Sequence, residues 1–256
     1  MKTIETTCKT ALSPSRLPGL DYSLNPYRGC SHQCAYCYVP SILRISKIDW
    51  QTHIQIKTNI PNILAKELKR KKPGTVGIST VTDPYQPLEK QYHLTRYCLE
   101  QLKKHDFPIN LQTKSSNIDQ DLKLITQFTQ PEIMISIATT NDHHRQLLEP
   151  HSSPLQQRLN TLKLYADTGI KTSVFLGPLY PTLSIQDIEQ LISQFADIGV
   201  DEIMIDKFHL KPGIWGSIAH NLQSEPSLQT HFKSAFFTKK NSYYTNLIKT
   251  IETTCK

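Results

Sequence analysis

The chain has 256 residues and a formal net charge of +7, a length that suits one core domain and a charge that favours an anionic partner such as nucleic acid. No apolar run approaches the ~20 residues needed to span a bilayer, and no lipidation motif is present. These features exclude a membrane protein, and without a charged-then-apolar leader we expect a soluble, cytoplasmic one.

Residues 1–20 are polar and contain Pro14 and Pro18, which predicts an N-terminal arm without a regular pattern. Beyond the arm, apolar β-branched runs typical of strands alternate with segments of helical periodicity. The strand-like runs are one with Tyr22 and Leu24 and those at 75–81, 109–113, 132–138, 171–176 and 201–205. The helical segments are 62–71, 92–104, 120–128, 154–168 and 185–198.

Strand followed by helix, repeated along a chain, indicates a parallel sheet with right-handed crossovers. About six strands are too few to close an eight-stranded barrel. We therefore predict an α/β fold, a partial (β/α)6 TIM-type barrel with an N-terminal arm and a helical or irregular C-terminal tail. The expected units are the arm at 1–20, the core barrel at 21–206 and a C-terminal extension at 207–256 that covers the barrel or its substrate mouth.

The stretch at 25–38 reads NPYRGCSHQCAYCY and sets Cys30, Cys34 and Cys37 at C-x3-C-x2-C spacing. One loop can turn these sulfurs toward one point, as a soft metal or an iron-sulfur cluster requires. Three thiolates leave one iron of a [4Fe-4S] cluster open to bind a reacting molecule. The alternative is a structural zinc site with His32 as fourth ligand; it is less favoured because structural zinc usually takes its ligands as two separated pairs.

Polar residues follow several predicted strands, at the rim where such folds bind their ligands. They are Thr82 and Asp83 after the run at 75–81, Lys114 after 109–113, Ser136 within 132–138, and Gly177 after 171–176. Each residue alone is equally explained by a turn, a cap or a surface position. Their common position on one rim, shared with the cysteine loop, makes them candidate ligand contacts.

The cysteine spacing, with Tyr36 before the third cysteine, resembles the signature of the radical S-adenosylmethionine (radical SAM) enzymes. Further segments make the chain similar to the spore photoproduct lyase-like branch of that family. They are TVTDPYQPLEK, TKSS, MISIATTND and LEPHSSPLQQRLNTLKLYADTGIKTSVFLGPLYP, and with the cysteine loop they cover roughly 25–181.

This resemblance implies an enzyme that binds a [4Fe-4S] cluster through the three cysteines and reductively cleaves S-adenosylmethionine (SAM). The resulting 5′-deoxyadenosyl radical would act on a substrate that the sequence does not identify. The resemblance also implies a flavodoxin- or ferredoxin-like reductant. For SAM it implies contacts of Thr82 and Asp83 with the amino group, of Lys114 and Ser136 with the carboxylate, and of Tyr36, Tyr38 and Gly177 with the adenosine.

Glu149 and Arg158 match a motif pair of that branch. The pair is interpreted as either a structural salt bridge or a substrate contact. Thr80 stands where photoproduct lyases carry a hydrogen-donating cysteine. A hydroxyl holds its hydrogen too strongly to quench a carbon radical as a thiol does, so Thr80 opposes DNA photoproduct (thymine dimer) repair, unless Cys98 or Cys8 supplies the thiol. That repair remains an alternative, as does a zinc-stabilised nucleic-acid-binding module.

Two features of the chain ends stand apart from the barrel. The tail interleaves basic residues with aromatics such as Phe208, Trp215 and Phe232, which could stack nucleic-acid bases, although packing on the open side of the barrel is the favoured interpretation. The octapeptide KTIETTCK occurs at both 2–9 and 249–256. Nothing in the sequence explains this duplication, and nothing in it specifies the oligomeric state.

Overall fold

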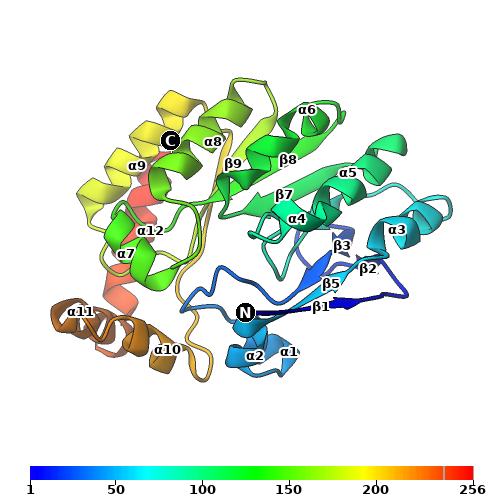
Figure 1. Cartoon of the computed structure of the whole chain (residues 1–256). Coiled ribbons are helices and arrows are strands. Elements are labelled where there is room, and N and C mark those ends of the chain that lie inside the picture. The colour runs from blue at the N-terminus through cyan, green and yellow to red at the C-terminus, as the bar shows by residue number, and fades with distance from the viewer. Residues whose placement is uncertain (239, 256) are drawn as a thin grey trace.

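A seven-stranded sheet forms the centre of the fold, with strand order β10-β9-β8-β7-β6-β3-β2 (Figure 1). The computed structural model describes residues 1–238 and 240–255. Neighbouring strands from β3 to β10 pair in parallel, and only β2 runs antiparallel, against β3. The strands are β2 (Leu12–Pro14), β3 (Tyr22–Leu24), β6 (Val76–Ile78), β7 (Ile109–Thr113), β8 (Pro131–Ser136), β9 (Lys171–Leu176) and β10 (Glu202–Ile205). Because β2 and β10 are both edges of this sheet, the predicted partial barrel is confirmed.

The strands begin and end where the sequence gives the strongest signals. β7 and β9 have the predicted limits. In β7, buried residues alternate with the half-buried Asn110 and Gln112, whereas β9 is a nearly continuous buried run from Thr172 to Leu176. β6 is shorter than the predicted run, since Ser79 adopts a left-handed conformation with φ of +60° and turns the chain away from the sheet. That turn directs the residues after β6 toward the site described below.

The crossover helices pack around the sheet, and most coincide with the predicted segments. They include α3 (Ile60–Leu68), α4 (Glu89–Tyr92), α5 (Leu94–Lys104), α7 (Asp142–Leu148), α8 (Leu155–Ala166) and α9 (Ile185–Ile198). α9 has the predicted limits because Ser184 and Asp187 form a capping box and Gly199 ends the helix with φ of +86°. The single helix expected at 120–128 is instead the 3₁₀ helix η1 (Ser116–Asp121) followed by α6 (Leu122–Ile125).

A second, three-stranded sheet of order β1-β5-β4 includes the start of the N-terminal arm, for which the sequence showed no regular pattern. Its strands are β1 (Lys2–Thr6), β4 (Tyr27–Arg28) and β5 (His53–Lys57). β1 leaves no pattern in the sequence because nearly all of its residues are exposed and it is held by main-chain pairing with β5. Helices α1 (Val39–Leu43) and α2 (Lys47–Thr52) connect the cysteine loop to β5.

The C-terminal tail is helical and packs against the barrel beside α9 (Figure 1). It contains α10 (Ile214–Asn221), α11 (Pro226–Phe237) and α12 (Lys240–Thr254), while residues 239 and 256 lie outside the described part. Phe208 and Phe232 are buried, with ring centroids 5.9 and 6.1 Å from that of Tyr180. These rings therefore belong to the core, as the packing interpretation predicts.

The duplicated octapeptide adopts two different structures at the two ends of the chain. Residues 2–6 form the parallel strand β1, whereas residues 249–254 continue the helix α12. Because the local sequence is the same, the surroundings of each copy decide its structure. In the described part of the chain, no helix combines the length and apolar character needed to cross a membrane.

Candidate functional site

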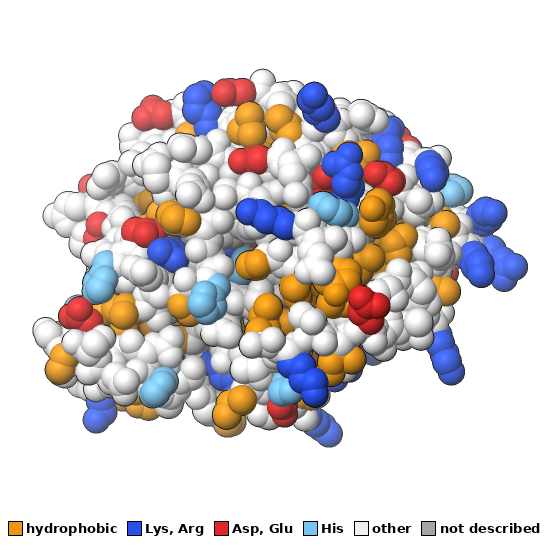
Figure 2. All heavy atoms as spheres, in the orientation of Figure 1, with side chains coloured by type: hydrophobic (Ala, Val, Ile, Leu, Met, Phe, Trp, Pro, Cys, Tyr) orange, Lys and Arg blue, Asp and Glu red, His pale blue; other side chains and the backbone are white. Residues whose placement is uncertain are grey.

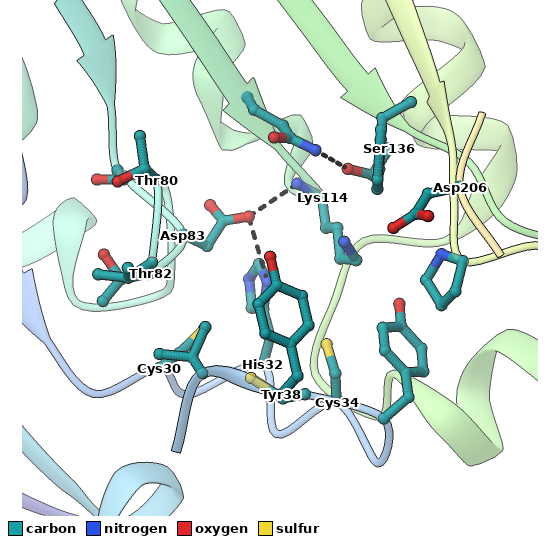
Figure 3. Close-up of a pocket in the computed structure, with 18 of the residues that line it drawn as sticks. Cys30, His32, Cys34, Tyr38, Thr80, Thr82, Asp83, Lys114, Ser136 and Asp206 are labelled. Atoms are coloured by element: carbon teal, nitrogen blue, oxygen red, sulfur yellow. Dashed lines mark hydrogen bonds and ion pairs between the residues drawn. The ribbon is translucent and has the colours of Figure 1, made fainter. Parts of the chain in front are cut away.

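One pocket lies between the cysteine loop and the carboxyl ends of the parallel strands (Figure 3). Every predicted site residue except Gly177 lines it, and the neighbour of Gly177, Pro178, lines it too. The predicted residues found there are Cys30, Cys34, Tyr36, Cys37, Tyr38, Thr82, Asp83, Lys114 and Ser136. The fold therefore brings together side chains that are as far apart in sequence as the cysteine loop and β8, as their positions at strand ends predict.

The cysteine loop is held in place by main-chain hydrogen bonds from two directions. The amide of Cys30 donates to the carbonyl oxygen of Trp50 at 3.1 Å, and the amide of Ala35 donates to that of Leu148 at 2.8 Å. Gly29 precedes the loop with φ of +99°, and a Cβ there would lie 2.6 Å from the carbonyl oxygen of His53. Only glycine fits this close approach of two backbones.

Cys30, Cys34 and Cys37 all carry free thiols. Burial raises the pKa of Cys30 to about 12, and it also raises the pKa values of the other two. A bound cation would reverse this, because metal coordination deprotonates a thiol. Within the described residues, no three His, Cys, Asp or Glu side chains are grouped for a single metal ion. A cubane cluster does not require such a group, since each thiolate binds a different iron.

Asp83 is fixed at the centre of the rim by donors from two strand ends. One carboxylate oxygen accepts from the Thr113 hydroxyl at 2.7 Å and the Tyr85 amide at 2.9 Å. The other accepts from the Lys114 amide at 2.8 Å. His32 Nδ1 lies 3.4 Å from this second oxygen but is too poorly directed for a hydrogen bond. The carboxylate thus faces the pocket in one defined orientation.

Three buried polar groups in the pocket lack hydrogen-bond partners: Ser79 Oγ, Thr82 Oγ1 and His32 Nδ1. An unsatisfied buried donor or acceptor costs roughly 1–3 kcal/mol. Native structures rarely leave several such groups together unless a ligand or ion completes them. The polar character of the pocket therefore fits a ligand that carries its own donors and acceptors.

Lys114 and Ser136 lie across the pocket from Thr82 (Figure 3). Lys114 Nζ lies 6.0 Å from the ring centroid of Tyr36, a cation–π distance. Ser136 Oγ accepts a hydrogen bond from Gln112 Nε2 at 3.3 Å. A cation and a hydroxyl are thus available in the same pocket as the Asp83 carboxylate.

Gly177 lies just outside the pocket lining and allows a close approach of side chains. A Cβ at this position would lie 2.8 Å from the ring of Phe175, which does line the pocket. The residue therefore has a packing role in addition to the adenosine contact predicted for it, and that contact stays a prediction.

A buried ion pair behind the pocket joins the cysteine loop to the barrel. Arg158 donates to Glu149 and also to the carbonyl oxygen of Ser136, at 2.8 Å. The Tyr36 hydroxyl donates to the other oxygen of Glu149. Burial alone would raise the pKa of Glu149, but the charges of Arg158 and Lys114 outweigh it and lower the pKa to about 2. Neither partner of the pair lines the pocket, which favours the salt-bridge interpretation over substrate contact.

Several pocket residues were not identified from the sequence. Asp206 directly follows β10, so the rule that identified Asp83 would also have identified it. His209 Nε2 lies 2.9 Å from Asp206 Oδ1, and both side chains are partly exposed at the pocket. Phe175 alternates with buried residues inside β9 and carries no signal of its own. Thr80, by contrast, was identified from the sequence as the residue at the position of the lyase cysteine, and it lines the pocket, where its hydroxyl donates to Ser23 at 3.4 Å.

Residues 24–195 match the family model of the radical SAM superfamily. A protein of Methanocaldococcus jannaschii is 30% identical over 75% of this chain and 72% of its own length. A protein of Mycobacterium tuberculosis is also 30% identical, over 81% of this chain but only 65% of its own length. The radical SAM Nalpha-GlyT isomerase of Pseudomonas phage M6 is 26% identical over 70% of this chain and 38% of its own.

Solved structures share the fold at low sequence identity. A spore photoproduct lyase complexed with a dinucleoside spore photoproduct superposes with a TM-score of 0.67, at 16% identity, over 92% of this chain and 80% of the lyase. A variant of that lyase with bound SAM and the same dinucleoside gives a TM-score of 0.64, at 15% identity, over the same shares of the two chains. These likenesses establish the fold of the spore photoproduct lyase-like branch.

Proposed function

The chain belongs to the radical SAM superfamily and is an enzyme of it, and we propose that Cys30, Cys34 and Cys37 hold its [4Fe-4S] cluster. When the cluster and SAM are bound, one electron from a flavodoxin- or ferredoxin-like reductant cleaves SAM and supplies a 5′-deoxyadenosyl radical. The substrate of that radical is not identified. The main observation in support of this proposal is that three free thiols of one loop line the same pocket as the polar rim of the barrel.

The thiols and the pocket fit the cluster chemically. Sulfur ligands from one loop are the donor set that iron-sulfur clusters use. Burial raises the pKa values of all three thiols, so the thiols are neutral in the metal-free loop. Burying neutral thiols costs little free energy. Cluster assembly must then release their protons, so loading should be easier at higher pH.

The rim residues would bind SAM at its amino-acid end. The fixed carboxylate of Asp83, with the unpartnered Thr82 hydroxyl beside it, suits an ammonium group. Lys114 and Ser136, on the opposite side, suit the carboxylate. This arrangement places opposite charges where a zwitterionic amino acid carries them, which orients the ligand as well as binding it.

The adenosine would lie against the aromatic side of the pocket, near Tyr36, Tyr38 and the turn at Gly177. Tyr38 is 45% exposed, so its ring has free area for a purine. Phe175 and Phe208 line the same pocket and limit the access of water. Asp206 and His209 lie on the outer rim and are the polar groups available to a substrate.

The proposed units of the chain follow from this arrangement. The core barrel at 21–206 carries the cysteine loop and the polar rim, preceded by the arm at 1–20. The extension at 207–256 contributes Lys207, Phe208 and His209 to the pocket, which supports a role in covering the substrate mouth.

Anaerobic reconstitution with iron and sulfide tests the proposal. The wild-type protein should become brown, contain about four irons per chain, and cleave SAM to 5′-deoxyadenosine under a strong reductant. Changing Cys30, Cys34 or Cys37 to alanine should abolish both properties, because two thiolates cannot hold the cluster. The control is Cys255→Ala, which removes an exposed thiol outside the loop and should change neither. Colour and cleavage retained in any of the three variants would contradict the assignment.

DNA photoproduct repair is the second candidate, supported by the net charge of +7. The hydrogen donor is its weak point, because Thr80 lines the pocket while Cys8 and Cys98 do not. On the face in Figure 2, Lys and Arg side chains are scattered among acidic and neutral ones instead of forming one basic stripe. An assay of the reconstituted enzyme on ultraviolet-irradiated DNA separates the two candidates, since only repair restores thymines.

A further inference from the structure

Helix α2 holds the cysteine loop through hydrogen bonds to main-chain oxygens, which the sequence alone does not predict. Trp50 accepts from the amide of Cys30 through its carbonyl oxygen, at 3.1 Å. Gln51 Nε2 donates to the carbonyl oxygen of Cys34 at 3.4 Å, and Gln33 Nε2 donates to the carbonyl oxygen of Gln51 at 3.3 Å. One short helix thus contacts the loop at several points between its first and second cysteines.

The same helix also carries a cationic side chain and a buried indole. Lys47 and Trp50 are three residues apart, a spacing that puts both on one face of a helix. The Lys47 ammonium donates to the carbonyl oxygen of Ala35, which lies between the second and third cysteines. Lys47 is therefore a half-buried cation fixed next to Cys34 and Cys37.

The indole of Trp50 presents an unused donor at the same place. The residue is only 2% exposed, and its Nε1 has no hydrogen-bond partner of ordinary geometry. The main chain of Trp50 accepts from the amide of Cys30, so this buried donor belongs to the part of α2 that contacts the cysteine loop. A neutral thiol is a weak acceptor, whereas a cluster-bound thiolate accepts an N–H more strongly.

We propose that Lys47 and Trp50 set the reduction potential of the cluster, Lys47 through its charge beside the cysteine loop and Trp50 through its buried, unpartnered indole N–H. This inference rests on the proposed cluster site. A reduced cluster carries one more negative charge than an oxidised one, and that charge spreads over its sulfurs. A nearby cation and an N–H donor therefore stabilise the reduced form more than the oxidised form, and they raise the potential.

The test is a redox titration of the reconstituted protein without SAM, followed by electron paramagnetic resonance. Trp50→Phe keeps the ring and the main-chain bond to Cys30 but removes the N–H, so its midpoint potential should shift to more negative values at an unchanged iron content. Trp215→Phe makes the same chemical change in α10, outside the contacts of the loop, and should titrate as wild type. Lys47→Met should shift in the same direction as Trp50→Phe, whereas Lys47→Arg keeps the charge and should stay near wild type.

Each outcome separates this inference from the proposed function. A wild-type protein that binds no cluster contradicts the proposed function itself. If wild type binds a cluster and all four variants share its potential, the role given to Lys47 and Trp50 is wrong. If Trp50→Phe fails to hold iron, the two Lys47 variants provide the test. A midpoint potential that shifts in Lys47→Met but not in Lys47→Arg supports the inference, and equal potentials in both variants overturn it.

Discussion

Replacing Arg158 by methionine should destabilise the protein, because the buried carboxylate of Glu149 would then lack a partner. Methionine fills much of the same space without a charge, so the fully buried Glu149 would lose its counter-charge. Removing one partner of a buried ion pair costs about 3–5 kcal/mol. Arg158 also donates to the carbonyl oxygens of Ser136 and Ser153, each at 2.8 Å, and both acceptors would lose that bond.

The pKa of Glu149 leads to a similar magnitude. Burial alone would raise it, but Arg158 and Lys114 bring it from 4.5 to about 2. A difference of this size corresponds to about 3 kcal/mol of stabilisation at neutral pH. Because the folded-state pKa is the lower one, the contribution is complete above about pH 4.5 and is lost as the pH falls toward about 2.

Urea unfolding of the metal-free protein, followed by circular dichroism, measures both effects. The free energy of unfolding of Arg158→Met should be lower than that of wild type by about 3–5 kcal/mol at about pH 7, and by less at about pH 3.5. Adding Glu149→Leu removes the stranded charge and should recover part of the loss. A difference below about 1 kcal/mol at neutral pH, or one that does not shrink in acid, would refute this reasoning.

Three further predictions concern the rim, a buried carboxyl and the tail. Asp83→Asn should weaken SAM binding about tenfold or more, because a charge-assisted hydrogen bond contributes about 1.5–3 kcal/mol; equilibrium dialysis at equal iron content measures it, and unchanged affinity would count against the amino-group contact. Burial raises the pKa of Glu89 from 4.5 to about 7, so stability should fall by up to about 3 kcal/mol as the pH rises through that range; urea unfolding should show this slope in wild type and not in Glu89→Gln, and a flat wild-type profile would contradict it. Phe232→Ala should cost about 3–5 kcal/mol because the ring is fully buried, whereas Phe237→Ala, at a ring that is 59% exposed, should cost much less; equal losses in thermal unfolding would argue against a packed tail.

The sequence predicted the barrel where each element carries its own signal. β7 alternates buried with half-buried residues, β9 is a nearly continuous buried run, and α9 has a capping box and a terminal glycine. The small sheet was missed because β1 is exposed and is held by its main chain. The repeated KTIETTCK shows why such a strand escapes local reasoning, since the same residues form a helix at 249–254.

The site was predictable to the same extent. Strand-end positions identified Asp83, Lys114 and Ser136, because parallel strands bring their carboxyl ends to one edge. The clamp by α2 could not be inferred, since it uses the carbonyl oxygens of Trp50 and Ala35, and main-chain groups leave no trace in residue type.

The most direct test of the central claim is the electron paramagnetic resonance spectrum of the reduced, reconstituted protein before and after addition of SAM. If the three cysteines leave one iron open and SAM binds it, the spectrum of the reduced cluster should change on addition of SAM. It should remain unchanged on addition of adenosine, which lacks the methionine part of SAM. A cluster spectrum that SAM leaves unaltered would contradict the claim that this pocket joins SAM to the iron.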